Sequence, residues 1–165
     1  MSRSLATGWA STVVVGSLTG IALTADRLPL RVASHFGASG LANGFMSRGT
    51  YLAITIGLVV GPPALVAVTV ALSLKYFPQF LNLPDREYWL APERRDATAA
   101  YLAAHATWLA ALLALFALGI HLLVVRANEN LPPRLETGPF LAMLLAFAIT
   151  MVAWIGALAR RFRRD

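Results

Sequence analysis

The chain has 165 residues, of which 58% are hydrophobic and only 13% are charged. Soluble domains carry roughly 25% charged residues, so this composition excludes an ordinary soluble globule and favours an integral membrane protein. The formal net charge is +6, but four of the fourteen basic residues lie in the last six positions, as in a tail that contacts anionic lipid; we therefore expect the lipid bilayer as a partner and no nucleic acid.

Four apolar stretches are long enough to cross a hydrocarbon core, which needs about 20 residues. They cover residues 6–25, 51–74, 101–125 and 140–159. We therefore predict an all-α integral membrane fold, a four-transmembrane-helix bundle that forms a single domain over residues 1–165.

Small residues recur at every fourth position of the first span, and these are Gly8, Thr12, Gly16, Gly20 and Thr24. Because lipid offers no hydrophobic drive between helices, such residues stabilise a bundle by letting helix backbones approach closely. We expect this face to pack against the small residues of the third and fourth spans, namely Ala103, Ala106, Ala110, Ala114 and Ala117, and Ala142, Ala146 and Thr150. A homodimer seam is the alternative.

Residues 26–50 connect the first two spans and bring together one Pro, one His, four Gly and three Arg. A loop of this length in a compact protein is usually functional or disordered. Leu28-Pro29 should end the first helix, because a residue before proline avoids helical geometry. Val32, Ser34 and Phe36 alternate with Arg31, Ala33 and His35, which predicts a short strand over residues 31–36.

The second half of this segment also carries signals of ordered structure. Asn43-Gly44 is typical of a tight turn, and Ser47 or Thr50 can cap the helix that follows. We therefore predict that residues 26–50 form a small ordered unit between the first and second spans, which we call the cap.

The second span contains Gly61-Pro62-Pro63 near its midpoint. Two prolines remove two backbone donors and should kink the helix sharply. The kink is either a fixed structural feature or a hinge, as in transporters with broken helices.

Residues 75–100 connect the second and third spans and carry balanced charge. Pro92 suits the first turn of a helix, and we expect that helix to continue through Asp96 into the third span. This connection is either a structured linker or a docking site for a cytoplasmic partner.

Basic residues predict the orientation of the spans. The N-terminus, residues 75–100 and the C-terminal tail together carry nine basic residues, against five in the other two connections. We therefore expect both termini in the cytoplasm and the cap facing outward.

Ionisable groups are scarce in the spans, since none of the four contains Asp, Glu, Lys or Arg, and the chain has no cysteine. Carboxylate-driven ion transport is therefore disfavoured. His105 and His121 are 16 residues apart and too distant to share a metal. No cofactor is predicted, although His35 and His121 face the same side of the membrane and form a weak candidate metal pair; His35 is alternatively a proton-sensitive switch. No nucleophile or phosphate-binding motif recommends an enzyme.

Two segments of the chain form recognisable patterns. The first is a Leu-Pro…His-Phe…Gly…Asn-Gly…Ser pattern formed by Leu28-Pro29, Ser34-His35-Phe36-Gly37, Gly40, Asn43-Gly44-Phe45 and Ser47, and the second is the run of residues 82–95. Together they resemble a bacterial family of small membrane proteins of unknown function. The same domain begins the SdpI-type immunity and signalling proteins, which protect a producer cell from its own secreted toxin. The resemblance implies a multi-pass protein of the bacterial inner membrane; the family has no generally assigned reaction.

The leading hypothesis is a non-enzymatic binding or sensing protein, or an immunity-like one, that acts through the cap. Candidate ligand-binding residues are those of the motif, namely His35, Phe36, Gly37, Gly40, Asn43, Gly44 and Ser47. One alternative is an accessory subunit of a larger membrane complex, and another is a small channel or carrier hinged at Gly61-Pro62-Pro63.

Overall fold

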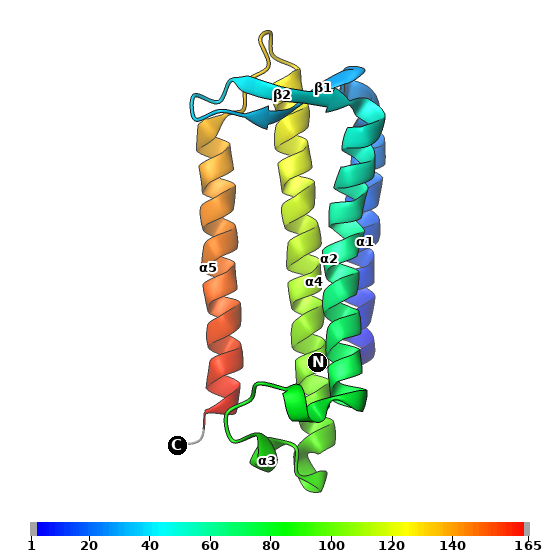
Figure 1. Cartoon of the computed structure of the whole chain (residues 1–165), viewed down its shortest axis with the longest axis vertical. Helices are drawn as coiled ribbons and strands as arrows, with labels where there is room; N and C mark the ends of the chain where they lie inside the picture. The colour runs from blue at the N-terminus through cyan, green and yellow to red at the C-terminus, as the bar shows by residue number, and fades with distance from the viewer. Residues whose placement is uncertain (1–2, 164–165) are drawn as a thin grey trace.

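The computed structural model describes residues 3–163, with side chains from Gly8 onward, and shows long helices side by side beneath a small β-hairpin (Figure 1). The long helices are α1 (Arg3–Thr24), α2 (Arg48–Tyr76), α4 (Pro92–Asn128) and α5 (Thr137–Phe162). Four helices within the described residues are long and apolar enough to cross a membrane, which confirms the number and helical nature of the predicted spans. The hairpin consists of β1 (Arg31–Phe36) and β2 (Ala42–Ser47), and the short elements are η1 (Ala25–Arg27), η2 (Pro78–Phe80) and α3 (Arg86–Trp89).

The core of the bundle lies where α1 and α2 pack against α4. Val13 and Ile21 of α1 and Val59 of α2 meet Ala111 and Ala114 of α4 in one buried cluster. The alanines of α4 allow close approach of both neighbouring helices, as expected for helix packing without a hydrophobic drive.

The small-residue stripe of α1 is mostly not part of this core, which corrects the packing prediction for Gly8, Thr12 and Gly16. Gly8 and Gly16 have open space where a side chain would be, and Thr12 is exposed. The other two residues of the stripe do lie against α4, since an added Cβ at Gly20 would be 3.1 Å from Leu118 and the Thr24 hydroxyl is 2.8 Å from His121 Nε2. The reason is that α4 supplies the small residues at this contact and α1 supplies the large ones. The homodimer seam stays a prediction.

Helix α5 packs against α4, on the side away from α1 (Figure 1). The rings of Phe116 and Phe147 are 4.2 Å apart. The expected contact of the fourth span with the first is wrong for its predicted residues, since Ala142, Ala146 and Thr150 are exposed. Large side chains, rather than these small residues, make the α4–α5 contact.

Aromatic residues join α5 to the rest of the chain at the end opposite the hairpin. Trp154 donates to the His105 carbonyl at 3.1 Å, and the His105 ring stacks on the Trp154 ring at 4.4 Å. Trp89 of α3 meets Phe162 edge to face, and the Arg161 guanidinium lies 4.6 Å from the Trp89 ring centre. His105 is therefore a structural link between α4 and α5.

The connection between α2 and α4 has the predicted helix start. Pro92 occupies the first turn of α4, and the helix continues through Asp96 into the third apolar span without interruption. A helix of this length is about 55 Å long, so its first turns extend well beyond a hydrocarbon core of about 30 Å.

Helix α2 runs as one element through Pro62 and Pro63. Pro63 is buried in the bundle, and Pro62 lies on a groove described below. Because Pro62 has no backbone N–H, the Leu58 carbonyl loses its helical donor at this point. The hinge at Gly61-Pro62-Pro63 stays a prediction.

The cap is an ordered antiparallel hairpin, which confirms the strand predicted at residues 31–36. The tight turn predicted at Asn43-Gly44 is wrong, because both residues belong to β2. The chain turns earlier, between Gly37 and Leu41, where Gly37 N–H donates to the Leu41 carbonyl at 2.9 Å.

Gly40 makes this earlier turn feasible, with a φ of +80° that L side chains rarely adopt. The predicted helix cap at Ser47 is confirmed, since its hydroxyl accepts from Thr50 N–H at 3.1 Å and ends the hairpin at the first turn of α2.

A second buried cluster fastens the cap to the bundle. Leu28 and Val32 pack against Tyr51 of α2 and against Val124 and Val125 of α4. All five side chains are nearly inaccessible, so the hairpin rests on the helices as part of the folded core.

The loop between α4 and α5 also holds the cap in place. Ala42 N–H donates to the Pro133 carbonyl at 3.1 Å, and Leu135 N–H donates to the Gly40 carbonyl at 2.8 Å. At the end of α4, Ala33 N–H donates to Asn128 Oδ1 at 2.8 Å, and Asn128 Nδ2 donates back to the Ala33 carbonyl at 2.9 Å. The cap is therefore tied to chain segments that are distant in the sequence.

Candidate functional site

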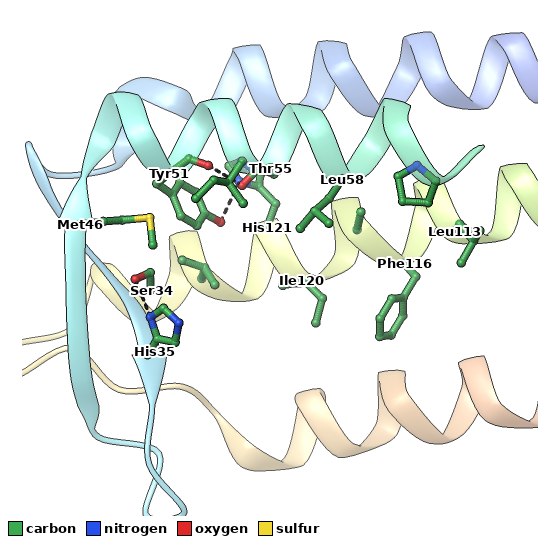
Figure 2. A pocket seen from close by; sticks show the side chains of 14 residues that line it. Ser34, His35, Met46, Tyr51, Thr55, Leu58, Leu113, Phe116, Ile120 and His121 are labelled. Atoms are coloured by element: carbon green, nitrogen blue, oxygen red, sulfur yellow. Dashed lines mark hydrogen bonds between the residues drawn. The ribbon is translucent and has the colours of Figure 1, made fainter. Parts of the chain in front are cut away.

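A groove of about 370 Å³ runs down the bundle from beneath the hairpin, between α2 and α4 (Figure 2). The hairpin covers its upper end, and the two helices form its walls. Its lining consists of Ser34, His35 and Met46 from the hairpin, Tyr51, Ile54, Thr55, Leu58 and Pro62 from α2, and Leu113, Phe116, Ala117, Ile120, His121 and Val124 from α4.

The polar side chains of the groove are gathered at its covered end. Ser34, His35, Tyr51, Thr55 and His121 all lie within the first turns next to the hairpin (Figure 2). Below them the lining is entirely apolar, and several of its side chains are open to the surroundings. The groove is thus polar at one end and hydrocarbon-like along the rest of its length, which is the polarity of an amphipathic molecule.

His121 is the centre of a buried hydrogen-bonded network at the covered end. Its side chain is fully buried, with Nε2 at 2.8 Å from the Thr24 hydroxyl and Nδ1 at 3.1 Å from the Tyr51 hydroxyl. The Thr24 hydroxyl also donates to the Gly20 carbonyl at 2.7 Å.

One of these hydrogen bonds can be given a direction. A hydroxyl has one proton, and because the Thr24 proton is directed at the Gly20 carbonyl, Thr24 Oγ1 accepts from His121 Nε2–H. His121 Nδ1 pairs with the Tyr51 hydroxyl, so both ring nitrogens have a partner. Three helices, α1, α2 and α4, are joined at this one ring.

Ser34 and His35 form a second polar pair at the mouth of the groove. The Ser34 hydroxyl and His35 Nδ1 are 3.0 Å apart. The neighbouring Gly44 leaves room for the imidazole, since a Cβ there would lie 2.9 Å from His35 Cβ. Gly44 is therefore needed for close approach between β1 and β2 rather than for a turn.

Comparison of the chain with family models, curated proteins and solved structures gave no match. The resemblance to the SdpI-type family accordingly stays a prediction.

Only one of the predicted ligand-binding residues lines the groove, and that residue is His35. Gly44 lies directly behind it, whereas Phe36 packs on the cluster that fastens the cap. Gly37, Gly40 and Asn43 lie in or beside the hairpin turn, and Ser47 caps α2. The motif is thus mainly a set of residues that shape the hairpin.

The candidate metal pair does line one groove, because both His35 and His121 contribute to it. However, no group of three His, Cys, Asp or Glu gathers anywhere in residues 8–163. Both nitrogens of His121 are engaged with Thr24 and Tyr51, so a shared metal requires the loss of one of these bonds. The geometry favours a structural role for His121.

The cap end of the molecule carries more positive than negative charge. Its three carboxylates each pair with an arginine, in Arg27–Glu129 at 2.6 Å, Arg48–Asp26 at 3.7 Å and Arg126–Glu136 at 3.5 Å. Two further arginines, Arg31 and Arg134, have no carboxylate partner among the described residues, and the Arg31 guanidinium lies over the Phe45 ring.

Several site residues were not found by sequence reasoning, above all Tyr51 and Thr24. Each pairs with His121 over 70 or more residues of chain, so no local spacing indicates the contact. The one available signal was a polar side chain at the cap-proximal end of each apolar span, which is also where residues at a membrane surface are expected.

Proposed function

We propose that the protein is a multi-pass protein of the bacterial inner membrane that binds an amphipathic ligand beneath its outward-facing cap. Its role is sensing or immunity-like, and it is not an enzyme. The observation that carries this proposal is the groove under the hairpin, with polar side chains at one end and apolar ones along the rest.

Two further features support a binding role over a catalytic one. The buried imidazole of His121 has both nitrogens occupied and has no free position to act as a base. The hairpin is held by the bundle and by the α4–α5 loop, so its groove-facing residues are held in a defined geometry, as affinity requires.

The proposed orientation predicts the behaviour of C-terminal fusions. Green fluorescent protein fused after Asp165 should fluoresce, and alkaline phosphatase fused there should be inactive, because the arginine-rich tail keeps this end in the cytoplasm. The matched control is fusion after Asn130, at the far end of α4, where both results should reverse. Active phosphatase after Asp165 would show that the cap faces inward.

Filling the groove should remove the ligand. We expect Leu58→Trp to deplete a small molecule that co-purifies with the wild-type protein in mild detergent, as measured by mass spectrometry of organic extracts. Leu58 lines the groove beside Pro62, so the larger indole occupies the volume that the ligand would take.

The matched control for this experiment is Leu65→Trp. Leu65 lies two helical turns further along the same face of α2, is similarly exposed, and is not part of the groove lining. We expect its extract to equal that of the wild type. Identical extracts from the wild type and Leu58→Trp would overturn the proposal that this groove is the binding site.

A further inference from the structure

The groove is as deep as one leaflet of a bilayer. Along α2 its lining runs from Tyr51 to Pro62, and along α4 from Val124 to Leu113. Eleven residues of α-helix rise about 16 Å, and half of a hydrocarbon core is about 15 Å. The groove as a whole therefore reaches from the cap to about the midplane, and its occupant has the length of a chain from a single leaflet.

The covered end of the groove offers a hydrogen-bond donor and no acid. If the Ser34 hydroxyl donates to His35 Nδ1, then His35 Nε2–H is free; if Nδ1–H donates to Ser34, then the Ser34 hydroxyl proton is free. Either arrangement leaves one donor of the pair unused. None of the groove-lining residues in the described chain is Asp or Glu, so an anion placed there meets no like charge.

The net positive charge at this end of the molecule also favours an anionic ligand. Arg31 of the cap and Arg134 of the α4–α5 loop remain as an excess of two positive charges after the three ion pairs at this end of the molecule are formed. Arg134 is next to the hairpin turn, since its side chain lies 3.5 Å from the Cβ position of Gly40. Basic residues at a membrane surface attract anionic headgroups.

From these three observations we infer that the ligand is an anionic lipid of the cap-side leaflet. One acyl chain occupies the groove between α2 and α4, and the phosphate accepts a hydrogen bond from the Ser34–His35 pair. This inference rests on the proposed function, because it names the ligand of the same groove.

The test compares two lipids with identical acyl chains, phosphatidylglycerol, whose headgroup carries a net negative charge, and phosphatidylcholine, whose headgroup is zwitterionic. Native mass spectrometry of the full chain, with both lipids at equal concentration, should give about fivefold more bound phosphatidylglycerol, the effect expected for about one basic contact. Leu58→Trp should remove this excess, and Leu65→Trp should keep it. Folding of each variant is checked by its thermal unfolding transition.

The arginine-rich tail also attracts anionic lipid, so the tail needs its own control. Arg134→Gln should reduce the preference for phosphatidylglycerol about fivefold. Arg160→Gln should leave unchanged the excess of bound phosphatidylglycerol that Leu58→Trp removes. A photoactivatable phosphatidylglycerol with its reactive group in the acyl chain should label peptides of the wild-type protein that contain Leu58 or Phe116. This experiment does not depend on the folding of any variant.

Each contrary result has a distinct meaning. Equal binding of both lipids, lost in Leu58→Trp, would overturn the anionic headgroup and leave the proposed function standing. A preference for phosphatidylglycerol that persists in Leu58→Trp would place the lipid outside the groove. If a membrane helix of another protein co-purifies and occupies the groove in place of lipid, the occupant is a protein and the inference is overturned.

Discussion

Replacing His121 by alanine is expected to lower the free energy of unfolding by about 3 kcal/mol, because a fully buried imidazole is lost and a cavity is left between three helices. The substitution also removes a hydrogen-bond partner of the buried Tyr51 hydroxyl, which lies 3.1 Å from His121 Nδ1. Equilibrium unfolding in mixed micelles measures the change.

The control for this prediction is His35→Ala. His35 is exposed, and within the described part of the chain its side chain hydrogen-bonds only to the neighbouring Ser34, so its loss should change stability by less than about 0.5 kcal/mol. A double-mutant cycle of His121→Ala with Tyr51→Phe isolates the shared bond and should give a coupling of at least about 0.5 kcal/mol. Purely additive effects would show that the two side chains act independently and that the network does not join the helices.

Replacing Gly40 by valine is expected to detach the hairpin turn from the α4–α5 loop and to cost about 2 kcal/mol, because the positive φ is strained for any L side chain and more so for a β-branched one. In addition, the new Cβ would lie 2.6 Å from the Leu135 carbonyl oxygen, a backbone atom that cannot move aside cheaply. Faster amide hydrogen exchange at Ala42 and Leu135 should report the loss of both cross-loop hydrogen bonds.

Gly49→Ala is the matched control, because Gly49 lies in the first turn of α2 with open space around it. Alanine is the better helix former, so this variant should be as stable as the wild type or slightly more stable. Equal hydrogen exchange in Gly40→Val and the wild type would mean that the loop does not hold the cap.

The helices could be predicted from the sequence because the length of an apolar run is a local property. The same holds for the strand at residues 31–36, for the Ser47 cap and for the start of α4 at Pro92. The position of the hairpin turn could not be predicted, because the first residue of β2, Ala42, is held by the carbonyl of Pro133, which is far away in the chain. Asn43-Gly44 is a good turn signal in isolation, and tertiary pairing overrides it.

The candidate site was predictable only at its mouth. His35 stands out in the sequence as the single imidazole of the cap, but the walls of the groove do not. Leu58, which lines the groove, and Leu65, which does not, are chemically identical residues on one face of one helix. In a membrane protein both lipid-facing and ligand-facing positions are apolar, so hydrophobic pattern cannot separate them.

The Asn128 carboxamide has a consequence for what kind of partner the cap can recruit. A lone two-stranded ribbon ordinarily presents unpaired backbone edges, which act as templates for β-augmentation by another chain. In this hairpin the outer edge of β1 is already closed at Ala33, where one amide side chain imitates the peptide group of a missing third strand. The edge of β2 is closed at Ala42 by Pro133. An extended peptide would therefore have to displace these hydrogen bonds to pair at Ala33 or Ala42, which favours recognition through side chains at this end.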